Sequence, residues 1–100
     1  MHIIAEICVI PINEKVSLRE EVALAHSILR QTGLNVELHS YGTNIEGDYD
    51  VIMNAVKTIH QTLHDNGTPR IHTSIKIGSR KDKTQTLQDK ISAVDDVLSR

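Results

Sequence analysis

The chain has 100 residues and a net charge of −2, and this length accommodates one domain around one core. The small net charge and the absence of Phe and Trp argue against a nucleic-acid-binding surface, and no apolar run approaches the ~20 residues of a membrane span. The single cysteine, Cys8, excludes a disulfide within the chain, and we expect a buried, inert thiol in a reducing compartment. Because the N-terminus also lacks the pattern of a signal peptide, we expect one cytoplasmic domain over residues 1–100.

The N-terminal third predicts a strand followed by a helix. Residues 2–12 are rich in β-branched side chains, and their alternation predicts a buried strand with Ala5, Ile7 and Val9 on one face. The segment Ser17-Leu18-Arg19-Glu20 is a capping box, which predicts the start of a helix. Its apolar stripe extends the helix to Thr32, and Gly33 is the expected stop.

Two short strands and a longer helix are predicted over the middle of the chain. Residues 35–41 alternate as a strand, and residues 43–47 form a short strand or the end of a tight hairpin. Asp48 or Asp50 can cap the following helix, which Asn66-Gly67 is expected to end. The apolar stripe of that helix consists of Ile52, Ala55, Val56, Ile59 and Leu63.

The C-terminal third predicts one strand, a polar loop and a last helix. Residues 70–77 alternate clearly, and the side chains expected to face the core are Ile71, Thr73, Ile75 and Ile77. The basic segment Arg80-Lys81-Asp82-Lys83 is short and contains an acid, so we interpret it as a solvated loop. The last helix has a narrow apolar stripe made of Leu87, Ile91, Val94 and Leu98.

The predicted order, β-α-β-β-α-β with an extra C-terminal helix, is that of an α+β, ferredoxin-like sandwich. Right-handed crossovers place both main helices on one face of an antiparallel sheet and leave the other face open. The side chains expected on this open face are Glu6, Cys8, Ile10, Glu37, His39, Tyr41, His72, Ser74 and Lys76. This set is too apolar for solvent and too polar for a core, so we expect a second subunit to cover it around a polar pocket.

The most informative segment is residues 42–47, Gly-Thr-Asn-Ile-Glu-Gly. Two glycines, which permit sharp turns and close approach, bracket a β-prone segment that carries one carboxylate. Glu46 is therefore placed to meet a polar or cationic small molecule. A turn with a solvated Glu46 is the plainer interpretation.

Other constellations point away from metal binding and catalysis. His60 and His64 are four residues apart on a predicted helix, a spacing that can hold a metal, but no convincing third ligand accompanies them. We therefore favour two ordinary surface or interface histidines and expect no bound metal. The sequence has no nucleophile elbow and no phosphate-binding glycine loop, so we expect no catalytic activity.

A series of short motifs runs almost the full length of the chain. They are Ala5-Glu6, Val9-Ile10-Pro11, Ser17-Leu18, Gly42-Thr43, Ile45-Glu46-Gly47, His60, Arg70-Ile71, Thr73, Ile75-Lys76-Ile77, Arg80, Asp82, Leu87 and Asp89-Lys90-Ile91. In this order and spacing they resemble the thiamine-binding, YkoF-like family of small ferredoxin-like proteins. The chain departs from the family pattern at Gly78, where an acidic residue is common, and in the charged segment Arg19-Glu20-Glu21.

The resemblance implies a homotetramer, a dimer of dimers with facing sheets, that binds thiamine or its hydroxymethyl-pyrimidine moiety without catalysis. Thiamine would be its ligand and not a cofactor. A carboxylate could accept from the aminopyrimidine or offset the thiazolium cation, hydroxyls could hydrogen-bond, and a tyrosine could stack. The ligand-binding residues expected on this basis are Glu46, Thr43, Glu6, Tyr41 and Ser74.

Two alternative functions stay open. The open-face polar residues could serve only an interface between subunits, in an oligomer without a small-molecule ligand. The chain could also be a small enzyme of thiamine-precursor metabolism, although no acid–base pair is evident. His39 and His72 are expected either to contact the ligand or to hydrogen-bond at the interface.

Overall fold

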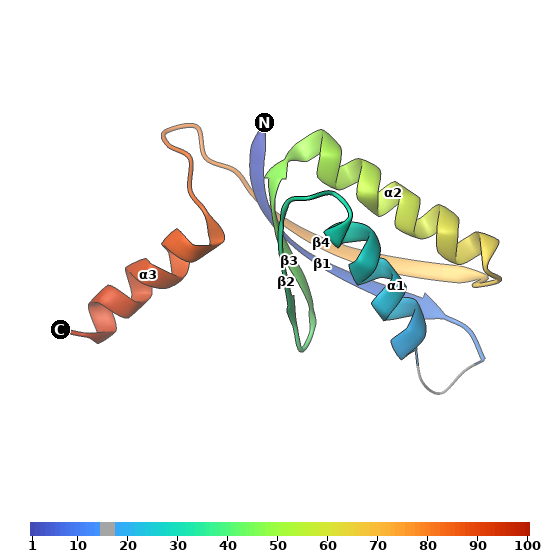
Figure 1. Cartoon of the computed structure of the whole chain (residues 1–100). Coiled ribbons are helices and arrows are strands. Elements are labelled where there is room, and N and C mark those ends of the chain that lie inside the picture. Colours follow the sequence, from blue (N-terminus) through green and yellow to red (C-terminus); the bar gives the residue numbers. More distant parts are fainter. Residues whose placement is uncertain (15–17) are drawn as a thin grey trace.

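The computed structural model describes residues 1–14 and 18–100 as one four-stranded antiparallel sheet with three helices (Figure 1). The elements in chain order are β1 (His2–Ile12), α1 (Arg19–Arg30), β2 (Asn35–His39), β3 (Gly42–Asp48), α2 (Tyr49–Asp65), β4 (Arg70–Gly78) and α3 (Leu87–Leu98). The strand order is β2-β3-β1-β4, and every neighbouring pair is antiparallel. The predicted ferredoxin-like fold with an extra C-terminal helix is therefore confirmed.

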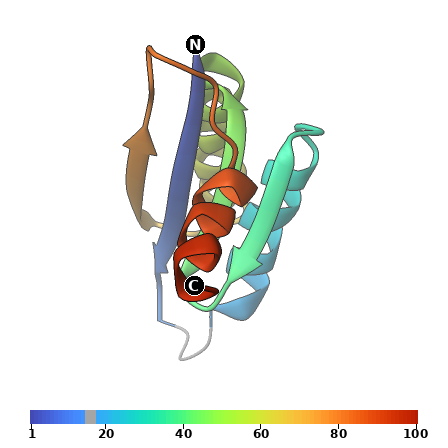
Figure 2. The same ribbon diagram turned by 90° about the vertical axis from the view of Figure 1, so that its left-hand side faces the viewer.

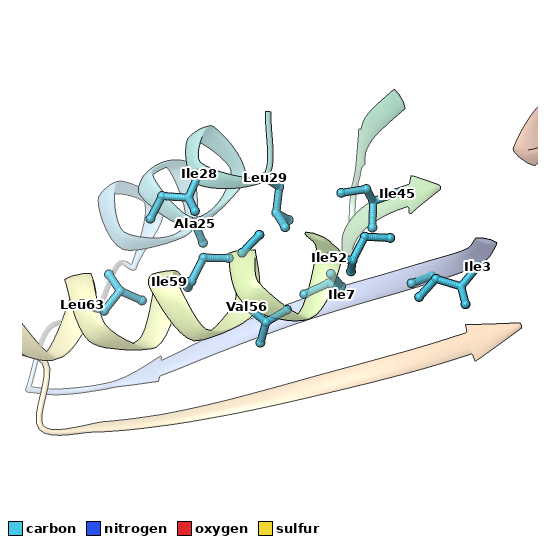
Figure 3. Packing of buried hydrophobic residues seen from close by; sticks show 12 residues of the cluster. Ile3, Ile7, Ala25, Ile28, Leu29, Ile45, Ile52, Val56, Ile59 and Leu63 are labelled. Atoms are coloured by element: carbon cyan, nitrogen blue, oxygen red, sulfur yellow. The ribbon is translucent and has the colours of Figure 1, made fainter. Parts of the chain in front are cut away.

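The core lies between the sheet and one layer formed by α1 and α2 (Figure 3). Alternation along β1 turns Ile3, Ala5 and Ile7 toward the helices, where each is at most 2% exposed. The stripe predicted for α2 is buried as expected, and Ile52 and Ile59 are fully covered. The opposite face of the sheet, the open face, carries no helix from this layer.

A local sequence signal sets the start of α2. Asp48 caps α2, since its carboxylate accepts from the amides of Asp50 at 3.1 Å and Val51 at 3.4 Å. The terminal ammonium of Met1 lies 3.0 Å from the same carboxylate, and this hydrogen bond is the main cause that lowers the pKa of Asp48.

The observed helix α1 differs slightly from the predicted one. It begins at Arg19 with Leu18 at the cap position, and the capping residue predicted at Ser17 lies outside the described residues. It ends at Arg30, two residues before the expected Thr32, whose hydroxyl instead donates to the carbonyl of Leu29 at 2.6 Å.

The outer strands are less covered than their alternation suggests. Ile77 was expected in the core but is 43% exposed, because it lies near the end of the edge strand β4. Strand β2 ends at His39 instead of Tyr41, because the chain turns there into β3. The amide of Tyr41 donates to Nδ1 of His39 at 3.2 Å, and the Tyr41 side chain is 86% exposed.

Helix α3 lies on the open-face side of the sheet, opposite α1 and α2 (Figures 1 and 2). Thr86 and Asp89 form a capping box at its start, and Leu87 is its one buried side chain. The rest of its apolar stripe is exposed within the single chain, with Ile91 at 48%, Val94 at 59% and Leu98 at 75%. Only the first turn of α3 is therefore attached to the body of the domain.

That attachment is made by Glu46 of β3. Its Oε2 accepts from the backbone amide of Leu87 at 2.6 Å, and its Oε1 accepts from Nδ2 of Asn35 at 2.8 Å. A carboxylate at the first amide of a helix satisfies an otherwise unpaired donor and interacts favourably with the helix dipole. Glu46 thus fixes where α3 leaves the sheet.

Gly42 is expected to tolerate no side chain. Its φ is 153°, and a Cβ there would lie 2.7 Å from the carbonyl oxygen of Ile7. We expect Gly42→Ala to lower the free energy of unfolding by about 1–3 kcal/mol in urea denaturation. Gly78→Ala is the control, because its nearest neighbour would be the carbonyl oxygen of Ile4 at 3.9 Å. Equal stabilities of the two variants would contradict this account.

The Glu46 attachment can be tested by hydrogen exchange. Glu46→Ala removes a charge-assisted hydrogen bond worth about 1.5–3 kcal/mol, so the Leu87 amide should exchange about 10- to 100-fold faster. The measurement is amide exchange followed by NMR. Glu37→Ala removes a carboxylate from the same sheet face without touching α3, and it should leave the Leu87 rate unchanged. A Leu87 rate that is the same in Glu46→Ala as in the parent would show that α3 is held by other contacts.

Candidate functional site

The strand register arranges the open-face side chains in rows that run across the sheet. The central row consists of Glu37, Asn44, Glu6 and Lys76, one from each strand. Glu6 thus stands between an amide side chain and an ammonium side chain. The row on the α3 side consists of Asn35, Glu46, Ile4 and Gly78. On the other side of the central row, His39 pairs with Gly42 and Cys8 pairs with Ser74.

His39 reaches Glu6 across the intervening strand. Its Nε2 lies 3.4 Å from Oε2 of Glu6, and β3 offers no side chain in the His39 row, because Gly42 stands there. The Tyr41 amide donates to Nδ1, so the proton of a neutral His39 ring is on Nε2 and faces the carboxylate. Nε2 is buried and makes no well-formed hydrogen bond within the described residues, so the contact is electrostatic.

A hollow of about 370 Å³ lies between this face and the start of α3, and we call it the sheet hollow. Glu6, Asn44 and Lys76 supply its polar wall. Ile4 and Leu87 supply much of its apolar wall, and Lys90 of α3 lines its edge. An apolar surface with a few convergent polar groups, in this size range, is typical of small-molecule sites.

A second hollow of about 230 Å³ lies between α1, β1 and the β2–β3 hairpin, and we call it the hairpin hollow. It is lined mainly by apolar side chains such as Val22 and Leu29, together with Tyr41. Thr43 lies on its helix side, only 5% exposed, with Oγ1 3.3 Å from Nδ1 of His26. The two hollows are separate and share no lining residue.

The structure divides the five predicted ligand-binding residues among different places. Glu6 lines the sheet hollow, and Glu46 lies on the same face with both oxygens already hydrogen-bonded. Ser74 is also on the open face, opposite Cys8. Thr43 and Tyr41 line the hairpin hollow instead.

Strand geometry explains this division and shows what the sequence reasoning missed. Thr43 and Glu46 are three residues apart in one strand, so their side chains point to opposite faces. Asn44, two residues before Glu46, shares its face and lies opposite Glu6 on the neighbouring strand. The alternation alone could have identified Asn44. The roles of Leu87 and Lys90 depend on the placement of α3 and have no local signal.

The histidine pair on α2 contacts neighbouring segments. Nε2 of His60 lies 2.6 Å from the hydroxyl of Thr73 on β4, and Nδ1 of His64 lies 2.8 Å from the carbonyl of Thr68. Across residues 1–14 and 18–100, no group of three or more His, Cys, Asp or Glu side chains is placed to hold a metal. In the same residues, no helix combines the length and the hydropathy that a membrane crossing requires.

The chain is similar to proteins from bacteria, archaea and fungi. UPF0045 protein sll0230 of Synechocystis is 41% identical, over 95% of this chain and 78% of the relative. UPF0045 protein ECM15 of Eremothecium gossypii is 36% identical, over 99% of this chain and 95% of the relative. The crystal structure of MJ1052 from Methanocaldococcus jannaschii superposes with a TM-score of 0.87 at 35% identity, covering 94% of this chain and 96% of that one.

A Thermotoga maritima protein, TM0486, provisionally named a thiamine biosynthesis/salvage protein, superposes with a TM-score of 0.81. The match covers 94% of this chain and 99% of that one at 23% identity, which shows the shared fold. The sequence model of the family described as thiamine-binding protein matches residues 5–95. With most of its length inside that match, the chain belongs to the thiamine-binding protein family.

Proposed function

We propose that this protein binds thiamine, or its hydroxymethyl-pyrimidine moiety, in the sheet hollow without transforming it. It would act as a carrier, buffer or sensor of the vitamin. Membership of the thiamine-binding family supports the class of ligand. The observation that carries the site is the half-buried carboxylate of Glu6, set between polar neighbours and an apolar wall.

The chemistry of the hollow fits the two rings of thiamine. Glu6 can accept from the exocyclic amino group of the pyrimidine or lie against the thiazolium cation. Asn44 can both donate and accept, and it shares the row of Glu6. Ile4 and Leu87 offer apolar surface to the ring faces. Glu46 contributes by holding Leu87 in place. The hairpin hollow, which Thr43 and Tyr41 line, is a second and smaller site that could bind an apolar group.

Binding without catalysis is favoured by the state of Glu6 and Glu46, two of the carboxylates on the open face. General acid–base work by two carboxylates needs both to be available to a substrate. Both oxygens of Glu46 accept hydrogen bonds, from Asn35 and from the Leu87 amide, so Glu6 is the one carboxylate that lines the sheet hollow.

The proposed assembly is a cytoplasmic homotetramer, a dimer of dimers. The exposed apolar stripe on α3, from Ile91 to Leu98, and the exposed Ile10 on the open face both lack cover in the single chain. Exposed apolar side chains of this kind favour burial against another chain. A second copy with its open face turned inward would cover both surfaces and close the sheet hollow from outside.

Calorimetric titration with thiamine tests the ligand and the site. Glu6→Gln keeps the shape of the side chain but removes its charge, so the affinity should fall about 10- to 100-fold. Glu37→Gln is the matched control, because Glu37 lies in the same row but does not line the hollow. Unchanged affinity in Glu6→Gln would remove Glu6 from the site. Absence of binding by the parent protein would overturn the proposed function.

Light scattering tests the assembly. The parent protein should be a tetramer at micromolar concentration, and Val94→Asp, which places a charge in the exposed apolar stripe, should yield smaller species. Asp96→Asn lies on the other side of α3 and should leave the mass unchanged. A monomeric parent protein would contradict the proposed assembly.

A further inference from the structure

A third hollow, of about 400 Å³, lies between the start of β1 and the segment that connects β4 to α3, and we call it the basic hollow. Its lining includes Arg80, Lys81, Lys83, Lys90 and His2, and it includes no Asp or Glu. The chain as a whole carries a net charge of −2, so this concentration of positive side chains is a local feature.

The carboxylates near the basic hollow are occupied by other partners. Asp82 pairs with Arg80, whose Nε donates to its Oδ1 at 2.9 Å and lowers the pKa of the Asp82 carboxyl to about 2. Asp89 is hydrogen-bonded to Thr86 in the capping box of α3. Asp48 is bound to the terminal ammonium.

The three lysines have no carboxylate bonded to them in the part of the chain that the structure describes. Within residues 1–14 and 18–100, no ion pair or hydrogen bond joins Lys81, Lys83 or Lys90 to an acid. Lys83 interacts with two carboxylates through its charge alone, which helps to lower the pKa values of Asp82 and Asp89. Asp82 therefore offsets the charge of Arg80, whereas no carboxylate of the described residues pairs with the three lysines.

The basic hollow adjoins the sheet hollow. Ile4, Gly78 and Lys90 line both, so one small molecule can extend from Glu6 to the lysines. One end of this combined space carries the carboxylate of Glu6 with Lys76 opposite it, and the other end carries Arg80, Lys81 and Lys83. Its complement is a ligand with a cationic or amino-bearing ring system at one end and an anion at the other.

We propose that the basic hollow binds the phosphate of a phosphorylated ligand whose rings lie in the sheet hollow. This inference rests on the proposed function, and it specifies a phosphate ester of thiamine as the preferred form. Lysine ammonium groups hold phosphate oxygens through charge-assisted hydrogen bonds, and Arg80 can add a planar pair of donors from its position beside Asp82. Lys90, at the boundary, can reach toward either part of the ligand.

Titration with thiamine and thiamine monophosphate at one fixed ionic strength tests the inference. The phosphate ester should bind the parent protein about 10- to 100-fold more tightly than thiamine. In the double variant Lys81→Gln/Lys83→Gln this preference should disappear, while the affinity for thiamine itself should stay within about threefold. The control Arg30→Gln/Lys57→Gln removes the same charge from α1 and α2, on the other face of the sheet, and should keep the preference. Thermal unfolding by circular dichroism establishes that both double variants fold.

The outcomes separate this inference from the proposed function. Equal affinity for thiamine and its phosphate ester, or a preference that survives in Lys81→Gln/Lys83→Gln, would overturn the inference and leave thiamine binding standing. If neither compound binds, the proposed function fails, and inorganic phosphate then tests the hollow alone by NMR. Saturable amide shifts over residues 79–85 that the double variant loses would support an anion site. No shift would overturn it.

Discussion

One carboxylate determines the shape of this molecule on its open face. Glu46 joins β3 to the first amide of α3, across 41 positions of sequence, and no other side chain is hydrogen-bonded to that amide in the described residues. Without this bond the helix would be tethered only by the segment after β4 and by the contacts of Leu87. Both the sheet hollow and the basic hollow use residues of α3 as walls. The candidate site therefore depends on an interaction that is itself part of the fold.

The fold gives the sheet one apolar face, which packs against α1 and α2, and one face with rows of polar side chains. The β1 residues that face α1 and α2 are aliphatic and bury the core, while those between them line up with polar residues of neighbouring strands. An antiparallel sheet with one covered face offers such rows at no cost to the core. Glu6 lies near the middle of these rows, and the cluster of lysines lies at the end where β4 continues toward α3. Glu6 and this cluster of lysines thus lie in two adjoining hollows that share Ile4, Gly78 and Lys90.

Much of the fold follows from local sequence, and much of the site does not. Period-two alternation in residues 2–12 and 70–77, the stripe of α2 and its Asp48 cap each have a local cause, and the structure confirms all of them. Thr43 and Glu46 were expected in one binding site, although side chains three residues apart in a strand point to opposite faces of the sheet. The partnership of Glu6 with Asn44 needs the strand register, and the contact of Glu46 with Leu87 needs the position of α3. Both are long-range properties, for which residues 42–47 contain no signal. The exposure of Ile77 similarly depends on the edge position of β4.

The single-turn attachment of α3 would couple the proposed assembly to the proposed ligand binding. Beyond its first turn the helix exposes its apolar stripe, so a neighbouring subunit packed against that stripe would also fix the positions of Leu87 and Lys90. Any ligand in contact with these residues would then favour the assembled state, and assembly would raise the affinity for the ligand by the same factor. The apparent dissociation constant would therefore fall as protein concentration rises. In such a system the cellular amount of the protein sets not only its capacity for the ligand but also how tightly each site holds it.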